Sequence, residues 1–401
     1  MAFARPRFLA SELRRTVPER PFDVELWDGT RVPSTDRVGP TFLVRSPAAV
    51  AHALRAPGQL GLGRAYVSGT LEVDDLDALI ALLGTWKPPP IDRLERARLA
   101  WAALRACGLE RPPRRPAAEL VLRGRAHSRA RDRAAVRHHY EVSNEFFALF
   151  LDESMTYSCA LFSRGAKSLE EAQGEKLELV CQKLGLVAGQ RVLDVGCGWG
   201  SFAIHAASRH GVEVLGLTLS ESQARLARER VRDAGLEHRV EIRVADYRDP
   251  LGPEFDAIAS IGMVEHVGEA QIDAYCRRLR APLRPGGRLL NQGIARLRHT
   301  DPAAGPFSER YVFPDAEPLQ LSRVARSLEQ AGLVIEHIEG FPDDYAATLR
   351  EWAVRLDARL DDAVALAGPE RVRVWRLYLR AARSGFETGF TSVFQVVCHR
   401  P

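Results

Sequence analysis

Residues 191–200 read RVLDVGCGWG, and this stretch determines how the rest of the chain is interpreted. An apolar strand runs directly into a glycine-rich turn, and the following residues, FAIHAASRHG (202–211), have the apolar spacing of a helix. Glycines let a ligand approach the backbone closely, and the first turn of a helix exposes unpaired N–H groups. A strand, glycine turn and helix in this order predict a cofactor site in an α/β sheet.

Strand and helix patterns alternate on both sides of this turn from about residue 165 onward. Between the predicted strands lie helical segments such as SLEEAQGEKLELVCQKLGL (168–186) and ESQARLARERVRDAGL (221–236). This alternation predicts parallel strands joined by right-handed crossovers, with helices on both faces. The predicted strands are RVLDVG (191–196), VEVLGLTL (212–219), VEIRVAD (240–246), FDAIASIG (255–262), RLLNQGI (288–294), VIEHIEGF (334–341) and TSVFQVVCH (391–399). The fold class is therefore α/β, with a seven-stranded Rossmann-like sheet.

The region before the sheet has a different pattern. Residues 1–110 predict a smaller mixed α+β domain, with a hairpin in VELWDGTRVPS (24–34) and helices in SPAAVAHAL (46–54) and DLDALIALLG (75–84). Residues 111–137 contain nine Arg against two acidic residues, which gives this segment a net charge of +7 and leaves −3 for the remainder of a chain of net charge +4. This segment is either a solvated linker or a patch that attracts anionic phosphate. Residues 138–401 then form the larger α/β domain, with a helical insertion near 345–384.

Composition excludes several classes of protein. With 46% hydrophobic and 27% charged residues among 401, the chain is neither disordered nor built to span a membrane, and we expect a cytoplasmic protein. Its six cysteines form no CxxC pair and show no His-rich spacing, so we expect reduced thiols and no metal site.

The turn itself has the pattern D-x-G-x-G-x-G, formed by Asp194, Gly196, Gly198 and Gly200. It differs from the dinucleotide fingerprint G-x-G-x-x-G. It resembles the motif of class I S-adenosylmethionine (SAM) methyltransferases, in which the acidic residue and the glycine backbone contact the amino acid part of the cofactor. The next strand ends in Thr218 and lacks the acidic residue that usually holds the ribose.

Several further motifs, taken in order, resemble the cyclopropane fatty acyl phospholipid synthase family. They are HHYEVSNEFFALFLDESMTYSCALF (138–162), TLSESQ (218–223), DYRD (246–249), SIGMVEHVG (260–268), RYVFPD (310–315) and DYAATLREW (344–352). The resemblance implies SAM contacts by Tyr157, Ser158, Gly196, Gly198, Thr218 and Gln223, with Gln223 replacing the missing ribose acid. It implies adenine contacts by Asp246 and Tyr247, and a bicarbonate ion surrounded by Cys159, Glu265 and Tyr345.

Such a site suits one-carbon transfer to a double bond. Attack of an alkene on the SAM methyl group develops positive charge on an acyl carbon, which must then lose a proton. A bound bicarbonate would stabilise the cation and accept that proton. Family members commonly carry a His after the fifth strand, whereas this chain reads LLNQGI (289–294), so Asn291 or Gln292 would have to donate through an amide, or His299 would have to fold back.

The predicted function is therefore one-carbon transfer from SAM to an unsaturated phospholipid acyl chain, giving a cyclopropane ring or a methyl or methylene branch. The expected partners are a membrane surface, contacted peripherally from the cytoplasmic side, and a second copy of the chain in a homodimer, with no nucleic acid. Two alternatives stay open: a methyltransferase of a soluble small molecule, and a SAM- or lipid-binding protein with impaired catalysis.

Overall fold

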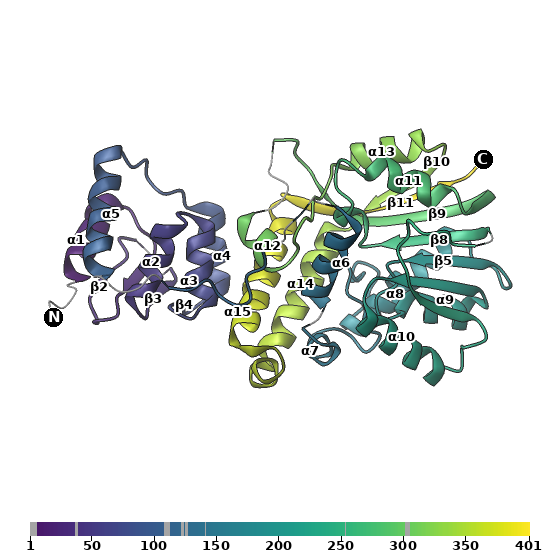
Figure 1. The fold of residues 1–401 in the computed structure, drawn as a ribbon, viewed down its shortest axis with the longest axis horizontal. Coiled ribbons are helices and arrows are strands. Elements are labelled where there is room, and N and C mark those ends of the chain that lie inside the picture. Colours follow the sequence, from purple (N-terminus) through teal and green to yellow (C-terminus); the bar gives the residue numbers. More distant parts are fainter. Residues whose placement is uncertain are drawn as a thin grey trace. The chain divides into compact units, whose positions relative to one another are not determined.

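The computed structural model describes residues 6–36, 39–107, 113–121, 124, 127–140, 142–252, 254–300 and 305–401, with residues 136–140 described by their backbone alone. The chain divides into two compact units. The first comprises Met1–Leu120, Gly305–Val312 and Ala367–Ser384, and the second comprises Val121–Ala304, Phe313–Leu366 and Gly385–Pro401. Figure 1 shows the elements of both units.

The first unit is a small α+β fold around a four-stranded sheet of order β2-β1-β3-β4. The predicted hairpin is confirmed, because Val24 of β1 pairs antiparallel with Val32 of β2. Both predicted helices are present as α2 and α4. The elements are α1 (Pro6–Thr16), β1 (Asp23–Glu25), β2 (Arg31–Val32), β3 (Thr41–Val44), α2 (Pro47–Arg55), α3 (Gln59–Val67), β4 (Leu71–Val73), α4 (Leu76–Thr85), α5 (Arg93–Cys107) and α12 (Pro306–Tyr311).

The second unit contains a seven-stranded sheet of order β10-β11-β9-β8-β5-β6-β7. Its strands are β5 (Arg191–Val195), β6 (Glu213–Thr218), β7 (Val240–Val244), β8 (Phe255–Ile261), β9 (Leu283–Arg296), β10 (Val334–Gly340) and β11 (Thr391–His399). Its helices are α6 (Arg129–Tyr140), α7 (Asn144–Ala148), α8 (Leu169–Leu184), α9 (Ser201–His210), α10 (Glu221–Asp233), the 3₁₀ turn η1 (Val264–His266), α11 (Ile272–Arg280), α13 (Leu321–Gln330) and α14 (Pro342–Asp357). This architecture confirms the predicted fold class.

The prediction of parallel strands throughout is wrong for β11. This strand runs antiparallel to both of its neighbours, β9 and β10. Its first residue, Thr391, pairs with Arg296 at the end of β9. The helices before β11 therefore deliver the chain to the carboxyl edge of the sheet, and the strand has to run back from there.

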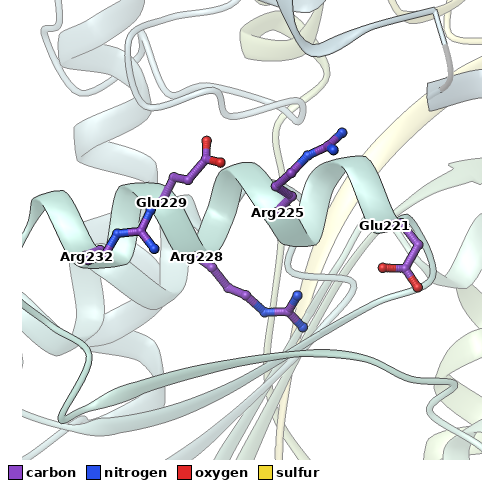
Figure 2. Close-up of a pocket in the computed structure, with 5 residues that line it drawn as sticks. All are labelled: Glu221, Arg225, Arg228, Glu229 and Arg232. Atoms are coloured by element: carbon purple, nitrogen blue, oxygen red, sulfur yellow. The ribbon is translucent and has the colours of Figure 1, made fainter.

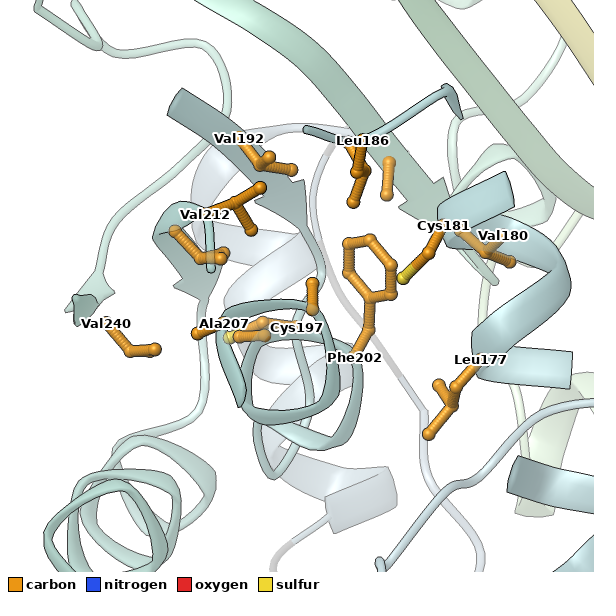
Figure 3. Close-up of a cluster of buried hydrophobic side chains, with 14 of the residues drawn as sticks. Leu177, Val180, Cys181, Leu186, Val192, Cys197, Phe202, Ala207, Val212 and Val240 are labelled. Carbon is orange, nitrogen blue, oxygen red and sulfur yellow. The ribbon is translucent and has the colours of Figure 1, made fainter. Parts of the chain in front are cut away.

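Apolar side chains cover both faces of the sheet, as alternation along each strand requires. Val192 belongs to a core cluster with residues of α8, α9 and α10, part of which Figure 3 shows. Leu193, the next residue along β5, belongs to a second cluster with residues of α11 and α13. Each fully buried Val or Leu contributes about 1.5–3 kcal/mol, so both helical layers are held mainly by this apolar burial.

The two units do not each consist of one continuous segment, as the expected boundaries at 110 and 138 implied. Helix α15 (Leu360–Glu387) is interrupted at Gly368, and its middle part belongs to the first unit. There, Arg380 and Arg383 both form ion pairs with Asp77 of α4. In the second unit, α6 occupies the end of the Arg-rich segment that was expected to be a linker.

No helix in the described part of the chain is both long and apolar enough to cross a bilayer. None of the six cysteines, all of which lie within the described residues, forms a disulfide bond.

Candidate active site

The carboxyl ends of the sheet strands in the second unit form one aligned edge. The aligned residues are Val195 with Ser260, Ile261 with Gln292, and Gly293 and Gly340 with Phe394. Gly293 and Gly340 are separated by one strand, β11, which places them about 10 Å apart. Ligands of open α/β sheets bind outside the carboxyl ends of the strands. Most of the sequence-predicted residues lie at or next to this edge.

The glycine turn between β5 and α9 needs glycine for two different reasons. At Gly196, φ is +82°, and an added Cβ would lie 2.6 Å from Cγ of Met263. At Gly198, φ is +55° and no atom lies within 4 Å of the Cβ position. The turn is anchored because the N–H of Gly196 donates to the carbonyl of Leu217, 2.9 Å away. The backbone at Gly198 is therefore accessible to a ligand, and Gly200 leads into α9 as its N-cap.

Asp194, the last residue but one of β5, has a buried carboxyl group. Its side chain is 2% exposed, and Oδ2 has no hydrogen-bond partner among the residues that the structure describes. Burial raises the pKa of Asp194 to about 7, although Lys176 opposes the shift. An acceptor left unsatisfied in a buried site costs free energy unless a ligand satisfies it.

Lys176 of α8 is a buried cation that the sequence analysis did not identify. Its ammonium group donates to Oγ of Ser158 over 3.0 Å, and burial lowers the pKa of Lys176 to about 8. The signal was present in the sequence, because Lys176 lies on the apolar face of its helix beside Leu177 and Val180. Lys176 links the predicted SAM residue Ser158 electrostatically to Asp194.

Thr218 and Gln223 are brought together as the resemblance implies. The Thr218 hydroxyl donates to Oε1 of Gln223 over 2.8 Å, and both side chains are buried. Ser220 caps α10 by accepting from the N–H of Gln223. The cap fixes the start of α10 and with it the position of the Gln223 side chain next to the end of β6.

Asp246 and Tyr247 follow β7, but the Asp246 carboxylate already has a partner. Both of its oxygens accept from the guanidinium of Arg248, at 2.8 and 2.6 Å. Arg248 also donates to Asp132 of α6 over 2.8 Å. The Tyr247 ring packs edge-on against Tyr275, with centroids 5.4 Å apart. The backbone and the Tyr247 ring are therefore more available for a contact with adenine than the Asp246 carboxylate is.

An aromatic group connects Tyr157 with Tyr345. The ring of Trp352 on α14 stacks on Tyr157 with centroids 5.1 Å apart, and it meets Tyr345 edge-on at 6.3 Å. Tyr345 also packs against Phe386 at 4.6 Å. These rings form one aromatic cluster that joins the Tyr157 segment to α14.

Cys159 lies next to the start of α14. The Cys159 side chain is 2% exposed, and its thiol contacts the carbonyl oxygen of Phe341 at 3.8 Å. That carbonyl also accepts from the N–H of Tyr345 at 3.1 Å. Ser163 donates twice to Asp344, from its N–H and its hydroxyl. These bonds bring Cys159 and Tyr345 to the same end of β10, and burial raises the pKa of the Cys159 thiol well above its usual range.

Glu265 is buried in the 3₁₀ turn after β8. Its Oε2 has no hydrogen-bond partner within the described ranges and lies 3.2 Å from the Cβ position of Gly293. Burial raises the pKa of Glu265 to about 7. Glu265 therefore faces Gly293, and the end of β10 near Cys159 is aligned with Gly293 across β11.

The two amide candidates of β9 lie on opposite faces of the sheet, because neighbouring side chains of a strand alternate. Asn291 shares the face of Gly293, and its Oδ1 accepts from the hydroxyl of Tyr275 over 2.8 Å. Gln292 points to the other face, where its Oε1 accepts from Gln395 over 2.9 Å. Only Asn291 is on the side of Glu265. His299, the third candidate, is exposed.

Two charged features lie outside this edge. A surface hollow of about 370 Å³ is lined by α10 side chains alone, with Arg225, Arg228 and Arg232 among them (Figure 2). In the Arg-rich segment, Arg129 and Arg131 form ion pairs with Asp249 and Asp315. Those two cations stabilise the second unit internally. The 138–162 motif begins with residues of which little is described: the side chains of residues 138–140 and the whole of residue 141 lie outside the described part of the chain.

Comparison with known proteins identifies similar sequences and folds. Residues 127–396 match the family model of mycolic acid cyclopropane synthetase. A probable fatty acid methyltransferase of Mycobacterium tuberculosis is 40% identical over 387 residues, which cover 94% of this chain and 90% of that protein. The cyclopropane-fatty-acyl-phospholipid synthase of Escherichia coli is 34% identical over 346 residues, covering 86% of this chain and 84% of that enzyme.

Among solved structures, a mycolic acid cyclopropane synthase complexed with SAH and CTAB superposes with a TM-score of 0.64 and 31% sequence identity. It covers 67% of this chain and 98% of its own. The similarity therefore extends to a protein whose complex holds both a cofactor product and a long-chain amphiphile.

Proposed function

Because the chain belongs to the mycolic acid cyclopropane synthetase family and is a SAM-dependent methyltransferase, we propose that it transfers a one-carbon unit to the double bond of an unsaturated phospholipid acyl chain. The product is a cyclopropane ring or a methyl or methylene branch. The observation that supports this most directly is the placement of two buried carboxyl groups, Asp194 and Glu265, each with one oxygen that lacks a hydrogen-bond partner among the described residues, at the carboxyl edge of one sheet.

The residues around the glycine turn fit SAM. When bound, SAM supplies an electrophilic methyl group. The orphaned Oδ2 of Asp194 would accept from the cofactor's amino group, and the open space at Gly198 admits the ligand to the backbone. Thr218 and Gln223 would hold the ribose, and Lys176 keeps a positive charge near Asp194, which favours the ionised carboxylate.

We propose that Glu265, Tyr345 and Cys159, which lie along the same edge of the sheet, hold a small anion such as bicarbonate, which would supply a base. The buried Oε2 of Glu265 would accept a hydrogen bond from the hydroxyl of the anion, and the Tyr345 hydroxyl and the backbone N–H of Cys159 would donate to it. Asn291 shares the face of Glu265, so we retain it as a further donor. Gln292 points to the opposite face, and our proposal gives it no contact with the anion.

We also propose that α5 of the first unit docks on an anionic bilayer. Three large apolar side chains of this helix are more than half exposed: Leu94, Trp101 and Leu104. Their spacing of seven and three residues puts them on one face of the helix. Exposed arginines flank them, at positions 93, 96, 98 and 105. Apolar and aromatic side chains bordered by basic ones are typical of a helix at the surface of an anionic membrane. Peripheral attachment to the inner face of the cytoplasmic membrane would bring the enzyme to its substrate.

Incubation of the full chain with methyl-labelled SAM and vesicles of unsaturated phosphatidylglycerol tests the main proposal. Label in the lipid, with an acyl mass increase of one CH₂ and loss of the double bond, indicates a ring. A gain of one CH₂ with the double bond retained indicates a methylene branch.

Label confined to a water-soluble product would instead support the small-molecule alternative. Binding of SAM and vesicles without transfer would support the non-catalytic alternative. Either result would contradict the proposal.

A further inference from the structure

Helices α8 and α9 place three metal-binding side chains together, Cys181, His205 and His210, and Glu178 contacts both histidines. Glu178 and Cys181 are three residues apart on one face of α8, and His205 and His210 come from α9. The sulfur of Cys181 and one ring nitrogen of each histidine all lie within 4.8 Å of one another. One carboxylate oxygen, Oε2 of Glu178, lies 3.2 Å from Nε2 of His205 and 3.1 Å from Nε2 of His210.

The spacing of these atoms is close to that of a tetrahedral zinc site. Zn–N bonds of about 2.0–2.1 Å and Zn–S bonds of about 2.3 Å place the ligand atoms of one tetrahedron roughly 3.3–3.8 Å apart. The two separations between Glu178 and the histidines already have nearly this length. The thiol and the imidazoles, which now lie within 4.8 Å, need to approach one another by up to about 1.5 Å, and side-chain rotation can supply such a shift.

The metal-binding side chains are mostly buried, and the cluster is open to solvent on one side. Cys181 is fully buried in the core cluster between α8 and α9, where Figure 3 shows it beside Phe202. The side chains of His205 and His210 are 18% and 20% exposed, and that of Glu178 is 35% exposed. An ion can therefore enter from the Glu178 side. His210 is the last residue of α9, and the carboxyl end of a helix favours a cation.

We propose that Cys181, His205 and His210, with Glu178 as the fourth ligand, bind Zn²⁺. One thiolate, two imidazoles and one carboxylate form a donor set that this ion prefers. The ion would clamp α8 to α9, the helix that begins directly after the glycine turn. The sequence analysis expected no metal site because its ligands come from two helices without a CxxC pair or His-rich spacing.

Zinc binding by the full chain, freed of any polyhistidine tag, tests this site. The protein is stripped with a chelator, dialysed against ZnCl₂ alone, and its bound zinc is measured by mass spectrometry. We expect about one Zn²⁺ per chain, and a loss of affinity of at least about 100-fold in Cys181→Ser and in His210→Gln. Cys276→Ser, which alters another buried thiol in the other core cluster, is the matched control and should bind like the unaltered chain. Failure of the unaltered chain to bind zinc, or equal binding by both site variants, would overturn the proposal.

Substitution with Co²⁺ provides a readout that does not depend on the folding of a variant. Cobalt bound through Cys181 in a tetrahedral site produces a thiolate-to-metal absorption band in the unaltered chain. Bound cobalt without that band would place the metal elsewhere and refute the assignment. Neither measurement depends on methyl transfer, so this proposal can fail while the proposed function holds.

Discussion

Replacing Glu265 by Gln should make the protein more stable at alkaline pH and slower as an enzyme. The unfolded chain releases the Glu265 proton near pH 4.5, whereas the folded protein retains it until about pH 7. Stability therefore falls as the pH rises through this window, because the folded state has to ionise a buried carboxyl group. The displacement of the pKa from 4.5 to about 7 corresponds to about 3 kcal/mol.

The glutamine variant has the same shape and no proton to lose. We compare the free energy of unfolding of the variant with that of the unaltered protein. The difference, variant minus unaltered, should be about 3 kcal/mol larger at pH 8 than at pH 4.5. Turnover should fall roughly 10- to 100-fold, because a hydrogen bond to a charged group contributes about 1.5–3 kcal/mol. The affinity for SAM should not change, since Glu265 is assigned to the anion and not to the cofactor.

Urea unfolding at several pH values, steady-state kinetics and calorimetric titration with SAM measure the three effects. Glu237→Gln, at an exposed position, is the control and should leave all of them unchanged. A stability difference that does not vary with pH would show that Glu265 is not held protonated by burial. Undiminished turnover would refute its catalytic role.

Three further substitutions test other parts of the molecule. Lys176→Met removes the cation that opposes protonation of Asp194, so more of the Asp194 carboxyl groups should be protonated at pH 7. The dissociation constant for SAM should therefore rise several-fold at pH 7 and recover at pH 9, and calorimetry showing no change would contradict this. Gly196→Ala should lower the free energy of unfolding by about 1–3 kcal/mol more than Gly189→Ala, since both have positive φ but only Gly196 would place a Cβ 2.6 Å from another side chain; equal losses in urea titrations would refute the steric argument. Trp101→Ser should weaken cosedimentation with anionic phospholipid vesicles by roughly 10-fold at an unchanged melting temperature, and equal binding would exclude α5 as the docking face.

The sequence predicted the sheet well, because apolar strands and helices alternate clearly around the glycine turn. It did not predict the direction of β11, since a strand pattern carries no information about polarity. Local sequence patterns could not predict the division into units either, because ion pairs of Arg380 and Arg383 with Asp77 join segments some 300 residues apart.

The candidate site was predicted where short motifs carry it. Thr218 and Gln223 are adjacent in the structure, and Cys159 and Tyr345 meet at the end of β10. Lys176 was missed because it belongs to none of the short motifs, although its place on the apolar face of α8 indicated burial. The α8–α9 cluster was missed because residues far apart in sequence form it.

The course of α15 affects how this protein can be divided in the laboratory. Its two ends lie within the catalytic unit, whereas its middle part is folded into the N-terminal one. A truncation starting at residue 121 would retain Arg380 and Arg383 but delete the aspartate that neutralises both of them. The fragment would lose both of these ion pairs and expose a stretch of helix that the N-terminal unit covers, so a loss of activity after such a cut would reveal nothing about membrane attachment. Point substitutions on α5 avoid this ambiguity.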